Sequence, residues 1–256
     1  MPSSKPSIAE LRAVCQPPAV VGRRSDEHWA GRLYMRGVSI HVTRVFVGWG
    51  FTADAVTISM LAVGLIGAAA LFIGGVWPAV TAMLAVQAYL LLDCVDGEVA
   101  RWRQTESARG VYLDRISHYL VESLLLIGLG WRVGQGDRGI WLAVGLGAAI
   151  AVLLSRLETD LVDAARAKAG MTAIGDSGSD LRVRPLRWLR RVFDFIPVHR
   201  ITGAVEVSVL ITVAAVTDRV RGDLAASRAL LVSVALVAGL VAVGHLLAVL
   251  VSDRLR

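Results

Sequence analysis

Cysteine is scarce in this chain, which has only two cysteines in 256 residues. Cys15 and Cys94 lie far apart in the sequence and give no disulfide framework, so we expect both thiols to stay reduced in the cytoplasm. The chain also lacks the ligand spacing of a zinc site, the Gly-x-Ser-x-Gly turn of serine hydrolases and the phosphate-binding loop of P-loop NTPases. These absences exclude a disulfide-stapled secreted domain and the most familiar soluble hydrolases.

The first 25 residues, MPSSKPSIAELRAVCQPPAVVGRRS, have no apolar core and no cleavage site of a secretory signal. We therefore predict a cytoplasmic N-terminal arm over residues 1–26. The remaining residues, 27–256, are predicted to form one membrane domain.

Apolar residues are abundant, at 55% of the chain, which is more than a soluble domain normally carries. A bilayer core about 30 Å thick needs roughly 20 apolar residues per helix. We predict an all-α polytopic membrane protein with six transmembrane helices, at residues 53–75, 78–92, about 111–131, about 139–157, about 201–217 and about 229–251. Residues 27–48 mix apolar side chains with arginines and are predicted to form an N-terminal interfacial, or juxtamembrane, helix.

Arginine placement predicts the orientation, because cytoplasmic loops keep positive charge. With six spans, most arginines fall beside the two termini and in the connections near 102–109 and 165–200. The opposite side has only Arg132, Arg138, Arg219, Arg221 and Arg228. Both termini are therefore expected in the cytoplasm. The composition, which is rich in Ala, Gly, Val and Arg, suggests a bacterial source, so we expect the protein in the bacterial inner membrane. The anionic lipids of that membrane explain the net charge of +6 without a nucleic acid partner.

Acidic side chains are concentrated in residues 93–118, DCVDGEVARWRQTESARGVYLDRISH, between two apolar stretches. Charged groups at membrane depth are costly and indicate function. On helices, Asp93 and Asp96 lie on neighbouring faces, while Asp114 and His118 are one turn apart. Two facing helices would bring these groups to one point, where divalent cations relieve the repulsion between carboxylates. Hard oxygen ligands favour Mg²⁺ or Mn²⁺.

Two glycines accompany the acids, since Gly97 follows Asp96 and Gly110 lies one turn before Asp114. Each costs a helix about 1 kcal/mol relative to alanine, and in return allows a phosphate group to approach the backbone closely. Arg101 either meets such a phosphate or only marks the cytoplasmic side.

These residues resemble the CDP-alcohol phosphotransferase family, whose motif is D-x-x-D-G-x-x-A-R, about eight residues, then G-x-x-x-D-x-x-x-D. Seven of its eight fixed positions match with the correct spacing, and the final acid is replaced by His118. Upstream, the segment from Thr52 to Thr57 is similar to the family's lead into its first span, with Ala53 and Asp54 in place of Pro-Asn. The likeness covers residues 32–130 well and the rest only in layout.

The resemblance implies that a CDP-linked donor binds two divalent ions, Mg²⁺ or Mn²⁺, and that an acceptor hydroxyl attacks the β-phosphorus and releases CMP. Its metal ligands would be Asp93, Asp96 and Asp114, with His118 as a possible fourth. The residues that would seat the nucleotide are Thr57, Gly97, Ala100, Arg101 and Gly110. Family habit and glycine-rich helices suggest a homodimer.

His118 allows three interpretations. It could deprotonate the acceptor hydroxyl, since imidazole is a competent base, with Glu122 one turn on accepting a hydrogen bond from the other ring nitrogen. It could instead ligate a metal and favour manganese, or it could mark an inactive relative.

The substrates are less defined by the sequence. Residues 171–200 contain Arg182, Arg184 and Arg187, which could meet lipid phosphates at the interface or grip a phosphorylated acceptor. The expected donor is CDP-diacylglycerol, with a soluble CDP-polyol as the alternative, and the acceptor is a polar alcohol or alcohol phosphate. A non-catalytic transporter or scaffold is the other function class, although acids near one interface fit it poorly.

Overall fold

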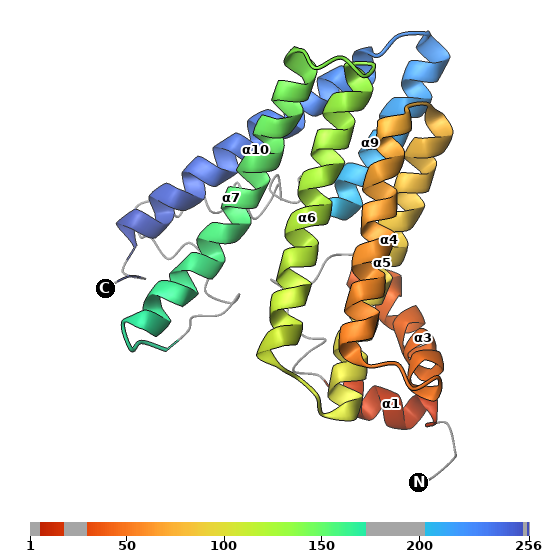
Figure 1. Cartoon of the computed structure of the whole chain (residues 1–256), viewed down its shortest axis with the longest axis vertical. Helices are drawn as coiled ribbons and strands as arrows, with labels where there is room; N and C mark the ends of the chain where they lie inside the picture. Colours follow the sequence, from red (N-terminus) through yellow and green to blue (C-terminus); the bar gives the residue numbers. More distant parts are fainter. Residues whose placement is uncertain (1–5, 18–29, 173–202, 253–254, 256) are drawn as a thin grey trace. The chain divides into compact units, whose positions relative to one another are not determined.

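The computed structural model describes residues 6–17, 30–172, 203–252 and 255, and every regular element among them is helical (Figure 1). The chain divides into two compact units. One consists of Met1–Gly67 with Leu84–Val121, and the other of Ala68–Met83 with Glu122–Arg256. The predicted all-α class is thus confirmed for the described residues.

The first unit contains the motif of acids and glycines in residues 93–118. Its helices are α1 (Ile8–Cys15), η1 (Gly31–Met35), α3 (Arg36–Gly48), most of α4 (Ala53–Ala70), and the motif-bearing parts of α5 (Val76–Arg103) and α6 (Ala108–Val133). Helix α1 begins with a capping box, in which Ser7 and Glu10 each accept a hydrogen bond from the other's backbone N–H. Leu11 and Cys15 of α1 are fully buried against Ile40 of α3. The predicted arm therefore includes a helix that is packed within this unit.

The turn between α5 and α6 brings the two halves of the motif together. The N–H of Thr105 bonds to the carbonyl of Ala100, and the N–H of Gln104 bonds to that of Arg101, which is the Schellman pattern. Gln104 has a φ of 54°, in the left-handed region where glycine is usual. Ser107 then caps α6, because its hydroxyl accepts from the N–H of Gly110 at 3.1 Å. A tight reversal follows directly from these local bonds.

The second unit contains η2 (Leu71–Ile73), the start of α5, the end of α6, α7 (Ile140–Lys168), α9 (Ala204–Arg221) and α10 (Ala225–Val251). Helices α7 and α10 pack side by side (Figure 1). Within this pair, Nδ1 of His245 lies 3.1 Å from Oε2 of Glu158. His245 and Glu158 thus form a polar contact between these two helices.

Within the part of the chain that the structure describes, four helices are long and apolar enough to cross a membrane: Ala53–Ile73, Val76–Arg103, Ile140–Lys168 and Ala225–Val251. Helices α6 and α9 occupy the third and fifth predicted spans but fall outside this group. The reason is their charge, since α6 carries the motif's Asp114 and α9 includes Glu206 and Asp218. Residues 30–48 are helical as expected, while their position at a membrane interface stays a prediction.

Candidate active site

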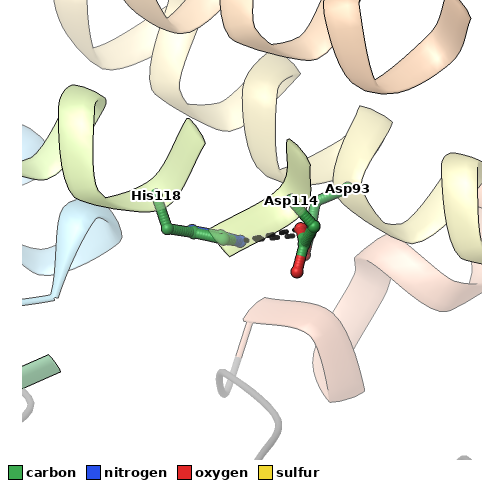
Figure 2. Close-up of side chains that lie close together, drawn as sticks. All are labelled: Asp93, Asp114 and His118. Carbon is green, nitrogen blue, oxygen red and sulfur yellow. Dashed lines mark hydrogen bonds and ion pairs between the residues drawn. The ribbon is translucent and has the colours of Figure 1, made fainter. Parts of the chain in front are cut away.

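Three predicted ligands meet in the first unit. Nε2 of His118 lies 3.2 Å from Oδ1 of Asp93 and 3.4 Å from Oδ1 of Asp114 (Figure 2). Asp93 comes from α5, whereas Asp114 and His118 are one turn apart on α6. One ligand atom from each of the three residues lies within 4.8 Å of the other two. The arrangement places two carboxylates and one imidazole around a single point.

This donor set suits a divalent cation. Two carboxylate oxygens and an imidazole nitrogen are ligands that Mg²⁺ and Mn²⁺ accept in proteins. Oδ1 of Asp114 is buried and has no hydrogen-bond donor among the described residues, apart from the long contact with His118. A buried carboxylate oxygen without a donor is costly unless a cation or another donor joins it. The residues present therefore fit the metal that the motif implies.

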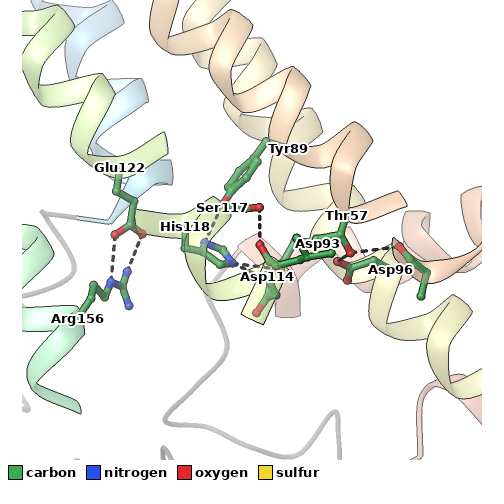
Figure 3. Close-up of polar contacts among 11 residues, drawn as sticks. Thr57, Tyr89, Asp93, Asp96, Asp114, Ser117, His118, Glu122 and Arg156 are labelled. Carbon is green, nitrogen blue, oxygen red and sulfur yellow. Dashed lines mark hydrogen bonds and ion pairs between the residues drawn. The ribbon is translucent and has the colours of Figure 1, made fainter. Parts of the chain in front are cut away.

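The other nitrogen of His118 is held by Tyr89, not by Glu122. The hydroxyl of Tyr89 lies 2.7 Å from Nδ1 of His118, and the Tyr89 side chain is fully buried (Figure 3). The suggested hydrogen bond from His118 to Glu122 is wrong, because both Glu122 oxygens accept from Arg156, at 2.7 and 3.0 Å. Glu122 lies on the expected helical stripe, but an arginine on α7 satisfies it better than a neutral imidazole could.

Asp96 takes a different environment from Asp93. Its Oδ2 accepts a hydrogen bond from the hydroxyl of Thr57 at 2.8 Å, and the side chain is buried (Figure 3). Asp96 is not part of the close ligand group found in the described residues. Thr57, which was expected to contact the nucleotide, thus orients a carboxylate that was expected to bind metal.

The predicted nucleotide residues line the same two helices. A Cβ atom on Gly97 would lie 3.2 and 3.3 Å from the terminal nitrogens of Arg101, so the guanidinium covers this glycine. Ala100 lies between them in sequence on α5, and Gly110 lies in the first turn of α6. A Cβ on Gly110 would meet only the Ser107 hydroxyl, at an ordinary 3.5 Å. Packing among the described residues therefore does not require glycine at position 110.

Asp54 stands where the family usually has asparagine. Its Oδ2 lies 3.3 Å from Nε of Arg109, the residue before Gly110. The pair is largely exposed and joins the starts of α4 and α6 beside the motif. The other predicted arginines, Arg182, Arg184 and Arg187, lie outside the described residues.

Sequence reasoning missed two buried polar residues of this site. Tyr89 lies in an apolar run, and its signal is a spacing of four residues before Asp93, which places both on one face of α5. Glu98 lies within the motif at a position without a fixed residue, and it is completely buried. Its only signal is an acid that follows Gly97 directly.

The comparisons agree with the geometry. Residues 51–176 match the family model described as CDP-alcohol phosphatidyltransferase. The chain is also 28% identical over 165 residues to the phosphatidylinositol phosphate synthase of Mycolicibacterium smegmatis, an alignment that covers 56% of this chain and 69% of that relative. The matched segment contains α4, α5, α6 and α7, including every described metal and nucleotide candidate. Residues 51–176 are therefore a domain of the CDP-alcohol phosphatidyltransferase family.

Proposed function

We propose that this protein transfers a phosphatidyl group from CDP-diacylglycerol to the hydroxyl of a polar alcohol and releases CMP, as a step of phospholipid synthesis. The single observation that carries the proposal is the convergence of Asp93, Asp114 and His118 inside the family's domain. The two carboxylates would repel a pyrophosphate unless cations lie between them.

Asp93, Asp96 and Asp114 are the proposed ligands of two Mg²⁺ or Mn²⁺ ions, with His118 beside them. When bound, such ions neutralise the phosphoryl oxygens and favour in-line displacement. Thr57 fixes the Asp96 carboxylate through its hydroxyl. Gly97, Ala100, Arg101 and Gly110 seat the cytidine diphosphate part of the donor, because the bare backbone of Gly110 permits close approach and Gly97 gives room to the Arg101 guanidinium.

His118 is proposed as the base. Its Nε2 faces the point on which both carboxylates converge, so an acceptor hydroxyl held there can give it a proton. The hydroxyl oxygen then forms its bond to the β-phosphorus while the bond to CMP breaks. Tyr89 supports the ring from the other side through Nδ1. Asp93 and Asp114 lie beside the positive charge that the imidazole acquires.

The donor and acceptor follow from chemistry around the site. A lipid donor fits a domain in which four helices are apolar enough to span a bilayer. The relative is a phosphatidylinositol phosphate synthase by its printed name, which favours an acceptor that already carries a phosphate. A soluble CDP-polyol donor is the alternative, and the Asp54–Arg109 pair, at a position where the family has asparagine, is the observation behind it.

The layout of the membrane domain is part of the proposal. Helix α6 with 26 residues is about 39 Å long, which exceeds a hydrocarbon core of roughly 30 Å. Helix α9 with 18 residues is about 27 Å long, at the short end of the roughly 17–25 residues that spanning helices use. We propose six crossings in a bacterial inner membrane, with both termini and the site on the cytoplasmic side, and a homodimeric assembly.

CMP release tests the activity. Purified protein is incubated with Mg²⁺, inositol phosphate or glycerol phosphate, and either CDP-diacylglycerol or a CDP-polyol. We expect CMP only with the lipid donor, and a loss of at least about 100-fold in Asp93→Asn, because one charged ligand is removed. Release with the CDP-polyol alone would select the alternative donor. Equal CMP release by wild type and Asp93→Asn would contradict the catalytic proposal and favour a non-catalytic membrane protein.

His118→Ala tests the base separately. Turnover should fall by about 10²–10⁴-fold, the usual contribution of a general base, while Mn²⁺ binding persists. Full turnover of this variant would remove the base role, and loss of Mn²⁺ binding would make His118 a metal ligand instead.

A further inference from the structure

Glu98 is a buried carboxylate that the proposed chemistry does not use. Its side chain is 0% exposed, in the middle of the motif on α5. Oε1 accepts hydrogen bonds from the Ser39 hydroxyl at 2.6 Å and from Gln16 Nε2 at 2.8 Å. Oε2 accepts from the Thr43 hydroxyl at 2.6 Å, and Nη1 of Arg36 lies 3.7 Å from Oε1. A charge buried this deeply requires such partners, so Glu98 ties the N-terminal segment and α3 to the motif.

The end of α1 is held closely against the same part of α5. Gln16 Nε2 donates to the carbonyl of Arg36 at 2.8 Å as well as to Glu98. The thiol of Cys15 lies 3.2 Å from the backbone carbonyl oxygen of Glu98 and is fully buried. The pair Cys15 and Gln16 therefore makes side-chain bonds in a region where the sequence predicted only an arm.

Arg101 completes this arrangement. Its Nε donates to the backbone carbonyl of Cys15 at 2.7 Å. Its two terminal nitrogens lie over Gly97, 3.2 and 3.3 Å from where a Cβ atom would stand. Because Nε is engaged by Cys15, the direction of the guanidinium is set from the N-terminal side, and the glycine provides the space that it occupies.

We infer that Cys15 and Gln16 position the Arg101 guanidinium over Gly97, so that helix α1 is a working part of the donor-nucleotide site. The inference rests on the proposed function, which makes Arg101 a ligand of the donor's diphosphate. An arginine side chain that is already ordered loses less conformational entropy on binding an anion. Cys15 and Gln16 are positioning residues, because they act through Arg101 and not on the substrate.

Gln16→Glu is the sharpest test. The change keeps the size of the side chain but places a second carboxylate against buried Glu98, which repels the end of α1. Gln16→Ala removes both hydrogen bonds without repulsion. Arg12→Ala is the matched control, because Arg12 is on the exposed face of the same helix. Deletion of residues 1–17 removes the Cys15 carbonyl itself.

We expect Gln16→Glu and the deletion to raise the KM for CDP-diacylglycerol and the Kd of CMP by about tenfold or more, the usual cost of a lost contact to a charged group. Turnover at saturating donor should stay within about threefold, and Mn²⁺ affinity, measured by electron paramagnetic resonance, should stay at the wild-type value, since the metal ligands are untouched. Gln16→Ala should show the same pattern more weakly. Arg12→Ala should match wild type in every measurement.

The outcomes separate this inference from the proposed function. Wild type without CMP release defeats the proposed function, while the CMP Kd series still tests the positioning. If Gln16→Glu displaces α1, unchanged KM and CMP Kd in that variant overturn the inference. If α1 stays docked in Gln16→Glu, the deletion decides, and unchanged KM and CMP Kd in the deletion overturn the inference. A joint fall of turnover, Mn²⁺ affinity and donor affinity also overturns it, because the segment would then support only folding.

Discussion

His118 is held through both ring nitrogens, and the two sides differ in chemistry. Carboxylates can only accept, so Nε2 carries a proton while it bridges Asp93 and Asp114, and it would become free to act as a base only when cations take up the two carboxylates. The Tyr89 hydroxyl can donate or accept, so it stays bonded to Nδ1 whichever nitrogen holds the proton. A carboxylate in place of Tyr89 could only accept a hydrogen bond and would therefore keep a proton on Nδ1. Tyr89 is therefore suited to a histidine that takes up and gives back a proton.

Tyr89→Phe should lower turnover by about 10- to 100-fold, the usual effect of removing a partner that orients a functional imidazole. The ring still fills its buried position, so the donor KM should stay within about twofold. Steady-state CMP release against donor concentration measures both. Tyr112→Phe is the control, because it removes the same hydroxyl from an exposed residue of α6. A Tyr89→Phe protein with wild-type turnover would show that the hydroxyl only completes the packing.

Cys15 should be chemically inert in the folded protein. Burial, with a further contribution from Glu98, raises the pKa of its thiol to about 11. Thiols react as thiolates, and at pH 8 only about one Cys15 in a thousand carries that charge. Peptide mapping after iodoacetamide treatment should find Cys15 unmodified in detergent at pH 8 and modified after denaturation in SDS. Rapid labelling of the folded protein would mean that α1 does not stay docked.

The sequence predicts the residues of the site better than their partners. Helical spacing predicted that Asp93, Asp96, Asp114 and His118 meet at one point, and three of them do, while Asp96 bonds to Thr57. The partner of an acid depends instead on what a neighbouring helix presents. Glu122 bonds to Arg156, 34 residues away, and no local pattern encodes that pairing.

At the scale of elements, glycine decides how closely helices approach. Within the second unit, a Cβ on Gly145 of α7 would lie 2.8 Å from the Leu126 carbonyl oxygen and 3.0 Å from Cα of Gly130 on α6. Within the first unit, a Cβ on Gly64 would lie 2.9 Å from Tyr89 and 2.5 Å from Val121. Gly64 and Gly145 therefore allow close packing inside the chain.

Gly145→Ala should destabilise the protein by about 1–2 kcal/mol, because overpacking against backbone atoms costs about 1–3 kcal/mol and exceeds the helix propensity gained. Gly147→Ala is the matched control on the same helix, since a Cβ there would meet nothing within 4 Å. It should leave stability unchanged or raise it by up to about 1 kcal/mol. Thermal unfolding in one detergent measures both variants. Equal stability of the two would contradict the close crossing of α6 and α7.

The helices themselves follow from the apolar runs, and their ends follow from polar groups that the runs do not contain. The second span was predicted over 78–92, whereas α5 continues to Arg103, because Glu98 and Arg101 are satisfied by the N-terminal segment. Such extensions depend on contacts with residues more than 80 positions away. Hydrophobic periodicity cannot report them.

For the whole molecule, the charge that makes α6 a catalytic candidate also weakens its membrane signal. Asp93 follows a long apolar stretch at the start of α5, but α6 contains Asp114, Arg115, His118 and Glu122 within a few turns. Pairing of these groups, as between Glu122 and Arg156, lowers the cost of placing them at membrane depth. The number of membrane crossings estimated from apolar composition is therefore too low when the reacting groups lie on the membrane-spanning helices.

Single cysteines distinguish six crossings from four. If α6 and α9 cross, the connection at 134–139 is outside and the chain after Lys168 is inside, whereas both are reversed if these two helices do not cross. Arg138→Cys and Ala169→Cys place thiols at exposed positions of these two connections, and both native cysteines are buried and give little background. With a membrane-impermeant maleimide on intact cells, we expect labelling of Arg138→Cys only, because arginines concentrate on the side of the second connection. Labelling of Ala169→Cys instead would limit the chain to four crossings and would leave α6, with Asp114 and His118, on the cytoplasmic surface.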